Sequence, residues 1–443
     1  MARVVSSEKL NLFSFFVFVI LVGSVLLALP FSWGGQRPIG YLNALFTSAS
    51  AVCVTGLTTV DTSQFSFVGQ LIIMLLIQAG GLGIISFTTL YLAVPKRKIS
   101  FRSIRLVREY YLDTIEYETT NIVRNIIVAT FAVEALGTIL LYAGFAPTVH
   151  RELFFTALFH SISAFCNAGF SLFSSGLEGY VADPFISIVF MVLIVLGGLG
   201  FVVLQDVWRR VRGARKRLHL HTRVVLVATG VLILSGLVIY YLLERENLLK
   251  SLSPGNQIVA AAFQSVTTRT AGFNTIDEAG MTTSSKLITL LFMFIGGAPG
   301  STAGGIKAST AAIIVLAMLK DVGIDGDMNV GNRKIGGRSI ARAHIFALKA
   351  LVLLFVCVFL LTLTELRGPG SEVSFLQIIF ESFSAFGTVG LTLGATPNLS
   401  ELGKIVIILT MFAGRVGLIS FALPGVRRRP ELIDYPEGEV LIG

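Results

Sequence analysis

Four short segments of the chain share a pattern of residue types, and each of them ends in a glycine. They are Val54, Thr55 and Gly56; Asn167, Ala168 and Gly169; Thr270, Ala271 and Gly272; and Thr388, Val389 and Gly390. The glycines lie 113, 103 and 118 residues apart (169 − 56, 272 − 169 and 390 − 272). A repeat this regular indicates a repeated architecture. The chemistry that such segments could supply is that of backbone carbonyl oxygens, which can take the place of water around a bare cation.

The glycine has a local reason to be present in each segment. Turning successive carbonyls toward one axis requires backbone angles that residues with a β-carbon reach only at a cost, and glycine removes that cost. Small residues also let helices pack closely in membranes, which is the plainer explanation for any single copy. Four copies in matching contexts favour a ring of carbonyls, and such a ring suits a dehydrated potassium ion.

The residues before each glycine repeat as well. A phenylalanine precedes the glycine by ten residues in three copies, at Phe46, Phe159 and Phe380, and Phe263 is one residue closer in the third copy. A Ser-rich apolar run follows each phenylalanine. Such a run is too short to cross a hydrocarbon core about 30 Å thick, so each is predicted to be a short helix that enters the membrane and turns back. Non-helical backbone at that depth must be buried in protein or line a wet cavity.

The composition is that of an integral membrane protein. Of the 443 residues, 54% are hydrophobic and 14% are charged, whereas soluble domains carry about 25% charged residues. The net charge is +9, but the basic residues lie between apolar spans, as in the cytoplasmic loops of membrane proteins. Lipid headgroups are therefore expected partners and nucleic acid is not. Cys53, Cys166 and Cys357 have no paired spacing, so neither a disulfide framework nor a metal site is indicated.

The order of the apolar runs predicts the fold class. The expected segments are 12–29, 43–53 and 67–94; 122–145, 152–166 and 185–207; 223–243, 257–268 and a broken span at 285–319; and 344–366, 375–386 and 402–423. This is an all-α membrane protein with four pseudo-repeats of helix, re-entrant pore helix plus filter loop, and helix, around a central ion pore. Eight spans place both termini on the same side.

Lysine and arginine set the orientation and the division of the chain. They gather in the links between repeats and after the last span, which marks the cytoplasmic side of the cell membrane, so both termini are expected there and the glycine turns face outward. The division is 1–95 for repeat 1, 96–118 for a cytoplasmic or interfacial link, 119–210 for repeat 2, 211–222 for a basic cytoplasmic link, 223–320 for repeat 3, 321–342 for a cytoplasmic link, 343–424 for repeat 4 and 425–443 for a cytoplasmic tail.

Two departures from the repeat predict a gate. In repeat 3 the stretch 296–307 holds five glycines and a proline, which disfavours a helix, although apolar segments flank it. It is predicted to be an intramembrane loop below the ring that blocks or opens the path. Its candidate gate residues are Gly296, Gly297, Gly300, Ser301, Thr302, Ala303, Gly304, Gly305 and Lys307.

Arg415 in repeat 4 occupies the position that glycine has in the other repeats. An arginine in mid-membrane almost always faces the protein interior or water. It is expected to lie below the ring, where it either bonds to the carbonyls of the loop or repels cations. A purely structural role, in which Arg415 holds the fourth span in place by hydrogen bonds, is the alternative.

Other polar residues carry weaker signals. Asp61 and Asp277 each follow their glycine by five residues (61 − 56, 277 − 272), so they could draw cations to an outer mouth or be solvated turn residues. Glu134, within a span, is a hydrogen-bonded packing group or part of a proton relay. We find no nucleophile, base and oxyanion arrangement, so an enzyme is not expected.

Together these features resemble the Trk/Ktr/HKT superfamily of potassium transporters over nearly the whole chain. The residues that carry the resemblance are Thr-Arg-Thr-Ala-Gly-Phe-Asn-Thr at 268–275, Gly-Ser-Thr-Ala-Gly-Gly-Ile-Lys at 300–307, Arg415 and the fourfold plan. Eight spans without two extra leading helices look most like the KtrB-type membrane subunits of bacterial Ktr systems.

The resemblance implies gated uptake of potassium by a homodimer with one ion pathway per protomer, controlled by a cytoplasmic KtrA-type ring of nucleotide-binding subunits. It implies that the four glycines form the filter, that 296–307 is the gate and that Arg415 lies below the filter. This chain contains no nucleotide-binding fold, so nucleotide control has to come from the partner. Sodium as a modulator and sodium as a cosubstrate are both compatible with the residues.

Two further hypotheses belong to other classes. The runner-up is a sodium- or proton-coupled secondary transporter with alternating access, for which broken helices are also typical. The other is a membrane scaffold without transport, which leaves the four glycine turns unexplained.

Overall fold

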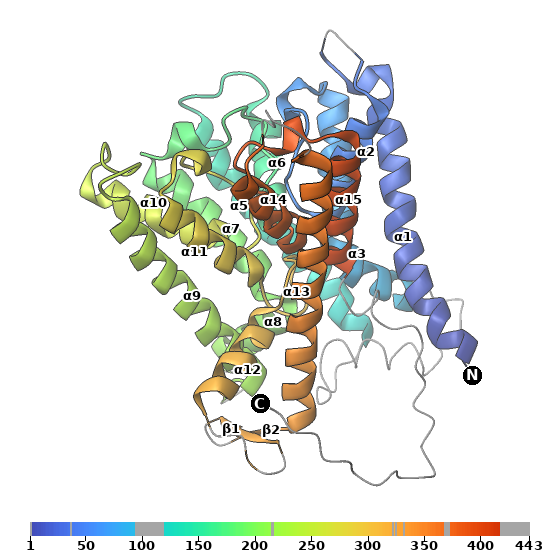
Figure 1. The fold of residues 1–443 in the computed structure, drawn as a ribbon, viewed down its shortest axis with the longest axis vertical. Helices are drawn as coiled ribbons and strands as arrows, with labels where there is room; N and C mark the ends of the chain where they lie inside the picture. The colour runs from blue at the N-terminus through green and yellow to red at the C-terminus, as the bar shows by residue number, and fades with distance from the viewer. Residues whose placement is uncertain are drawn as a thin grey trace.

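The structure is a computed structural model of the chain, and it describes residues 2–35, 38–93, 119–213, 217–320, 323, 326–330, 333–366 and 373–416. Figure 1 shows that this part of the chain is almost entirely helical. Its two strands, β1 (Met328–Val330) and β2 (Arg333–Ile335), form an antiparallel hairpin. The predicted helical class is therefore confirmed, with this small hairpin as an addition. The predicted links and tail at 96–118 and 425–443 lie outside the described residues.

The helices recur in groups of three, with a short helix in the middle of each. The groups are α1 (Ala2–Ala28), α2 (Tyr41–Cys53) and α3 (Phe67–Ala93); α5 (Thr119–Phe145), α6 (Leu153–Phe165) and α7 (Pro184–Leu199); α9 (Leu220–Glu244), α10 (Pro254–Thr267) and α11 (Thr283–Phe294); and α13 (Gly337–Glu365), α14 (Phe375–Gly387) and α15 (Glu401–Val416). Each short helix has 13 or 14 residues. At about 1.5 Å per residue, none of them is long enough to cross a membrane.

Contacts between the groups follow a closed order. Each short helix packs against the first helix of its own group. Between groups, α3 contacts α6, α7 contacts α10, α11 contacts α14, and α15 contacts α2. The last group therefore packs back against the first, and the four short helices are brought toward a common centre.

Local sequence signals begin the short helices. α14 begins with a capping box, in which Gln377 N donates to Ser374 Oγ (3.3 Å) and Ser374 N donates to Gln377 Oε1 (2.8 Å). α10 begins with Ser253 as its N-cap and Pro254 at its first position, where the missing N–H of proline costs no hydrogen bond. These caps fix where α10 and α14 start.

Three of the described helices are long and apolar enough to cross a membrane. They are Arg124–Phe145 within α5, α9 and α13. Their outward faces carry large apolar side chains, such as Phe131 and Phe355, which are 55% and 72% exposed. A surface of this kind is stable against lipid tails, where every backbone polar group is already bonded within its helix.

One predicted span is bent. The sequence predicts a continuous helix at 185–207, but α7 ends at Leu199 and α8 (Phe201–Val211) continues after a bend of 102°. The residue at the bend, Gly200, has a φ of 80°. The amide of Phe201 donates to the carbonyl of Gly300 (3.3 Å) instead of to a carbonyl of α7. The bend therefore exists because a distant loop supplies the hydrogen bond that a straight helix would have made.

Two other boundaries are resolved by the structure. The broken span predicted at 285–319 consists of α11, a loop and α12 (Ala308–Leu319). The first helix of the last group begins at Gly337, several residues before the predicted boundary at 343, and Gly337 N donates to Asp327 Oδ1 (2.6 Å). The β1–β2 hairpin leads directly into α13.

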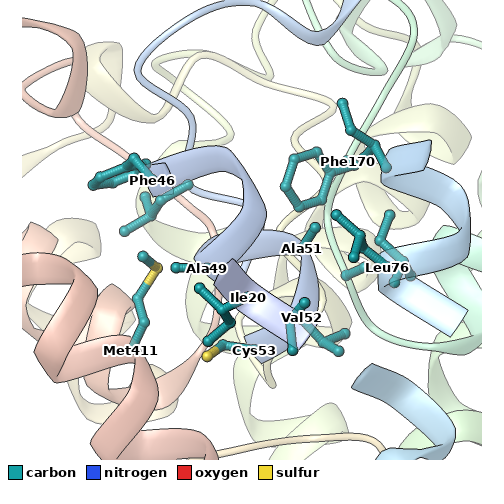
Figure 2. Close-up of a cluster of buried hydrophobic side chains, with 14 of the residues drawn as sticks. Ile20, Phe46, Ala49, Ala51, Val52, Cys53, Leu76, Phe170 and Met411 are labelled. Atoms are coloured by element: carbon teal, nitrogen blue, oxygen red, sulfur yellow. The ribbon is translucent and has the colours of Figure 1, made fainter. Parts of the chain in front are cut away.

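The helix α2 is enclosed by a cluster of buried apolar side chains (Figure 2). Phe46 and Ala49 of α2 are fully buried. Around them lie Ile20 of α1, Leu76 of α3 and Met411 of α15. Because lipid tails are as apolar as these side chains, the cluster is stabilised by close packing rather than by the exclusion of water. Small residues on α2 permit that close approach.

Candidate functional site

Each short helix ends in a turn with an uncommon backbone conformation. The residue two before the glycine and the glycine itself both have positive φ, which is 57° and 91° at Val54 and Gly56, 58° and 71° at Asn167 and Gly169, 69° and 77° at Thr270 and Gly272, and 48° and 96° at Thr388 and Gly390. Three of the four non-glycine residues are β-branched, and such residues rarely adopt these angles. Strain of this kind persists where the surrounding structure holds it, and it concentrates at functional sites.

Backbone hydrogen bonds hold these turns. In three turns an amide donates to the carbonyl five residues earlier: Thr55 to Ser50 (2.8 Å), Ala168 to Ser163 (2.7 Å) and Val389 to Ser384 (2.8 Å). This bond is typical of a Schellman helix end. After α10, Ala271 N donates instead to Thr267 O, four residues earlier (3.0 Å). The third turn is therefore built differently, in agreement with its run being one residue shorter.

Hydroxyl groups from the Ser-rich runs brace the turns. The amides of Gly56 and Gly390 donate to Ser50 Oγ and Ser384 Oγ, both at 3.1 Å. In the other two turns the hydroxyls of Ser163 and Thr267 donate to the carbonyls of Phe170 (2.8 Å) and Phe273 (2.6 Å). The repeated hydroxyl therefore ties each short helix to its turn, either at the amide of the glycine or at the carbonyl of the residue after it.

The four glycines meet in chain order and close a ring. A β-carbon built on Gly56, Gly169, Gly272 or Gly390 would meet the carbonyl oxygen of Ala168, Ala271, Val389 or Thr55, respectively. For Gly56 and Gly169 these separations would be 2.6 and 2.9 Å, which is closer than a carbon and an oxygen can approach. Each turn therefore lies against the next, and the fourth lies against the first. The structure thus brings together the four glycines and the residues directly before them, Thr55, Ala168, Ala271 and Val389.

A cavity of 410 Å³ opens on one side of this ring, and all four glycines line it. Asp61 and Asp277 line it as well. Asp61 Oδ1 accepts from Ser63 N and Asp277 Oδ1 accepts from Ala279 N, both at 2.9 Å. The two predicted carboxylates therefore line one cavity, and each also caps a short turn.

A third carboxylate in this cavity, Glu178, has no counterpart in the sequence pattern. It accepts from Asn274 Nδ2 (2.7 Å), and burial together with the nearby charge of Asp277 raises its pKa. Glu278, which is buried but also lines this cavity, accepts from Gln264 Nε2 (2.7 Å), and burial raises the pKa of Glu278 to about 8. Glu178 follows the glycine of its own group at a different spacing from the two aspartates, so a search for equal spacing cannot find it.

The loop at 296–307 lies directly against the ring. A β-carbon on Gly304 would meet the side chain of Thr388 and would stand 3.0 Å from the carbonyl oxygen of Gly387. Thr302 Oγ1 donates to the carbonyl of Phe165 (3.3 Å), at the end of α6. The loop therefore contacts the turns of the second and fourth groups.

The loop is held in shape by backbone bonds. Gly296 N donates to Ile306 O (2.8 Å), which joins its two ends. Ala298 N donates to Gly198 O (2.8 Å), which attaches the loop to α7. Within the loop, the ammonium of Lys307 donates to Ala303 O (2.6 Å). In all three bonds the acceptor is a backbone carbonyl. The shape of the loop therefore depends on its own backbone, and its position depends on the bond to α7.

Arg415 joins the loop to the first group. Its guanidinium donates through Nη1 to the carbonyl of Thr302 and through Nη2 to the carbonyl of Gly80 (2.6 Å). The side chain is buried, with 6% of it exposed. The guanidinium thus bonds to a loop carbonyl, which is one of the arrangements expected from the sequence. Because Arg415 belongs to the fourth group, the loop is tied to every group of the fold.

A set of glycines in the first helices of the groups has a packing role that the sequence pattern did not predict. Gly23, Gly137 and Gly236 lie where a β-carbon would meet the hydroxyls of Ser48, Ser161 and Ser265. Each of these hydroxyls donates to the carbonyl three residues before that glycine, at Ile20 (2.7 Å), Glu134 (2.7 Å) and Ile233 (2.8 Å). In the fourth group Cys357 Sγ lies 3.5 Å from Ser382 Oγ. The sequence contained a signal for this contact, because a small residue occurs in the helix before each Ser-rich run: Gly23, Gly137, Gly236 or Cys357.

The remaining candidates are not among the residues of the four turns, although Cys53 and Cys166 directly precede the first two turns. Gln78 Nε2 donates to Glu134 Oε2 (3.1 Å), so Glu134 is hydrogen-bonded inside the helix bundle. Cys53, Cys166 and Cys357 are buried free thiols. In the described part of the chain no three His, Cys, Asp or Glu side chains are placed to hold a metal ion.

Comparisons with known proteins agree with this architecture. A family model described as TrkH, cation transport protein, matches residues 11–430. Ktr system potassium uptake protein B of Vibrio alginolyticus is 39% identical, over 97% of this chain and 93% of its own length. Potassium/sodium uptake protein NtpJ of Enterococcus hirae is 37% identical, over 97% of this chain and 95% of its own length.

The same relationship is visible in three dimensions. The crystal structure of the potassium transporter TrkH from Vibrio parahaemolyticus superposes with a TM-score of 0.74, covering 94% of this chain and 84% of that chain at 19% identity. That likeness supports the fold, and the sequence matches support the family. The expected resemblance is therefore confirmed, and this chain is a membrane protein that belongs to the TrkH family of cation transport proteins.

Proposed function

We propose that this chain is the ion-conducting subunit of a potassium uptake system in the cell membrane. The observation that carries the proposal is the closed contact of four glycine turns, each with two positive φ angles. The names of the relatives, which are potassium or potassium/sodium uptake proteins, support potassium as the transported ion. The proposal assigns ion transport to this chain and no chemical reaction.

The ring is the selectivity filter, and it is formed by residues 54–56, 167–169, 270–272 and 388–390. Along an ordinary strand, successive carbonyls point to opposite sides. The alternating sign of φ in these turns removes that alternation, so neighbouring carbonyls can face one axis. Oxygens arranged in this way replace the hydration shell of a potassium ion. In this proposal the four pseudo-repeats, at 1–95, 119–210, 223–320 and 343–424, surround one pore.

The cavity beside the ring is the outer mouth. Asp61, Glu178 and Asp277 line it, and carboxylates in a narrow opening raise the local concentration of cations. Both termini are then cytoplasmic, in agreement with the lysine and arginine in the links between repeats. Ions enter the ring from this mouth.

The loop at 296–307 is the gate. It is packed against Thr388 on one side and is bonded by Arg415 on another. Moving the loop away from the ring breaks the buried hydrogen bond from Arg415 to the carbonyl of Thr302. This bond therefore stabilises the closed position of the loop. The positive charge of Arg415 near the path adds an electrostatic barrier to cations.

The partners follow from the Ktr relatives, whose names describe one protein of a multi-component system. We propose a homodimer with one pathway per protomer and a cytoplasmic KtrA-type ring that binds nucleotide. Sodium acts on this system as a modulator or as a cosubstrate.

Rubidium uptake by the purified protein in vesicles tests this function. We expect uptake without an imposed proton or sodium gradient, and little inhibition by an excess of sodium. A strict requirement for either gradient would favour the runner-up, a secondary transporter with alternating access. Absence of flux in every condition would refute transport by this chain.

A further inference from the structure

A second cavity, of 820 Å³, lies between α9 and α12, next to the two ends of the gate loop. It is separate from the cavity beside the glycine ring and shares none of its lining residues. Figure 1 shows α9 and α12 approaching each other near the β1–β2 hairpin, away from the short helices. The function proposed above makes no use of this cavity.

The walls of the cavity are two apolar helix faces. On α12 the lining residues include Ala308, Ala311, Ala312 and Val315, which follow the spacing of one helix face. The facing residues of α9 include Val227, which is 64% exposed. The alanines leave a groove that their side chains cannot fill, and α9 is long and apolar enough to cross a membrane. The groove therefore opens toward lipid tails.

One end of the cavity is strongly basic. Arg217, Arg223 and Arg333 line it, and no aspartate or glutamate does. Among the described residues, none of the three forms an ion pair, and all three are exposed. Arginine binds phosphate groups through paired N–H donors. Three such side chains beside an apolar groove match a molecule with an anionic phosphate head and a hydrocarbon tail.

We propose that this groove binds an anionic phospholipid, with the phosphate held by Arg217, Arg223 and Arg333 and an acyl chain lying between α9 and α12. Charge complementarity selects the headgroup, and the apolar walls select the chain. Basic pockets between helices are known to hold anionic lipid headgroups at the cytoplasmic side of membranes. A soluble phosphate would leave the apolar part of the groove empty.

The position of the groove connects the lipid to the gate. Ile295 and Ala308, which flank the loop at its two ends, both line the cavity. Ala308 N also donates to Gly297 O inside the loop (2.9 Å). A chain inserted between α9 and α12 fixes the position of α12, and through Ala308 it fixes the base of the loop. This coupling to flux rests on the proposed function, whereas binding of the lipid does not.

Lipid binding is measured by native mass spectrometry of the full-length protein titrated with phosphatidylglycerol or phosphatidylcholine. The test variant carries Arg217→Gln, Arg223→Gln and Arg333→Gln. We expect the wild type to prefer phosphatidylglycerol, and the preference to fall by about fivefold for each arginine removed. The matched control carries Arg210→Gln, Arg338→Gln and Arg342→Gln, which removes the same charge from exposed arginines that do not line the groove. It should keep the wild-type preference.

Two outcomes of this titration would overturn the site. An equal loss in both triple variants would mean that phosphatidylglycerol responds to general surface charge. Displacement of the lipid by soluble glycerol phosphate would mean that the arginines bind a free phosphate and the groove contributes nothing.

The apolar part of the groove is tested by Ala311→Trp, which fills it without changing charge. We expect this variant to lose phosphatidylglycerol binding while it still elutes as a folded protein. Undiminished binding would place the lipid elsewhere. Disulfide crosslinking of two chains through the variant Val227→Cys in lipid vesicles would show that a second copy covers the groove, which would also refute the proposal.

Rubidium uptake separates this inference from the proposed function. Wild-type uptake should differ severalfold between vesicles of phosphatidylcholine alone and vesicles that also contain phosphatidylglycerol, and the arginine variant should not respond. If no vesicle supports uptake, the proposed function fails and the binding result stands by itself. If uptake occurs and the variant responds like the wild type, coupling of the groove to the gate is refuted.

Discussion

The carbonyl oxygen of Val389 occupies the space that a β-carbon on Gly272 would need. Gly272 also has a φ of 77°. A side chain at this position is therefore disfavoured both by the clash with Val389 and by the backbone angle. We predict that Gly272→Ser lowers the preference for potassium over sodium by about tenfold, since a distortion worth about 1.4 kcal/mol between the two ions is sufficient. Competitive rubidium and sodium uptake in vesicles measures the ratio.

The matched control for this variant is Gly213→Ser. Gly213 has a similar φ of 74°, but nothing lies within 4 Å of its β-carbon position. It shares the backbone strain without the clash, so its ion preference should be that of the wild type. Unchanged selectivity in Gly272→Ser would remove the filter assignment.

Arg415 provides a test of the gate. Arg415→Gln removes the charge-assisted bond to Thr302 O, and bonds of this kind contribute about 1.5–3 kcal/mol. We predict that the loop leaves the ring more often and that rubidium flux rises about tenfold. Arg415→Lys keeps the charge and loses the two-sided geometry. If Arg415→Lys has the low flux of the wild type, repulsion of cations is the main effect of Arg415. If Arg415→Lys has the high flux of Arg415→Gln, the main effect is the hydrogen bond that anchors the loop. Lower or unchanged flux in the Gln variant would refute a closing role.

The bend at Gly200 gives a third prediction. A β-carbon there would stand 2.7 Å from the carbonyl oxygen of Pro299 in the loop. Gly200→Ala should therefore push the loop out of position and raise basal flux severalfold, with selectivity retained because the ring is untouched. Gly213→Ala serves as the control. Loss of selectivity together with the rise in flux would mean that the bend supports the filter rather than the gate.

Glu278 gives a prediction for pH dependence. Its pKa is about 8 in the folded protein, raised by burial above an ordinary value of 4.5. Between these values the folded state holds a proton that the unfolded state releases, so stability falls as pH rises and levels off above the folded pKa. We predict that the unfolding temperature in detergent drops from pH 6 to pH 9 in the wild type.

The isosteric variant Glu278→Gln keeps an acceptor for Gln264 Nε2 and cannot ionise. Its unfolding temperature should vary less over this pH range and should exceed that of the wild type at pH 9. Parallel curves for the two proteins would show that Glu278 does not titrate in this window.

The predictions from sequence succeeded where a local signal fixes the structure. The positive φ at each of the four glycines, the short helices before them and the helix break at 296–307 all follow from residue type and spacing. The direct contact between the turns was expected as well, because repeated segments in one membrane layer have equivalent positions. Arg415 bonds to a loop carbonyl, as one of its expected roles requires.

The bend between α7 and α8 shows why other features were missed. The motif Gly-Gly-Leu-Gly occurs at 80–83 and again at 197–200. α3 is continuous through the first copy, whereas the helix breaks at the second. The difference comes from Gly300, a residue far along the chain whose carbonyl bonds to Phe201 N. Identical local sequences therefore have different structures, and periodicity alone cannot separate them. Glu178 was missed for a related reason, because its place in the cavity depends on Asn274 of another group.

The contact between Gly390 and Gly56 joins positions separated by 334 residues (390 − 56). A membrane protein is inserted from its N-terminus onward, so this join is among the last to form during synthesis. A nascent chain that has emerged only through its third group holds three of the four turns and cannot close the ring. In the function proposed above, the ring that surrounds the ion is complete only once the fourth group has been made, so a shorter translation product would conduct no ions through it.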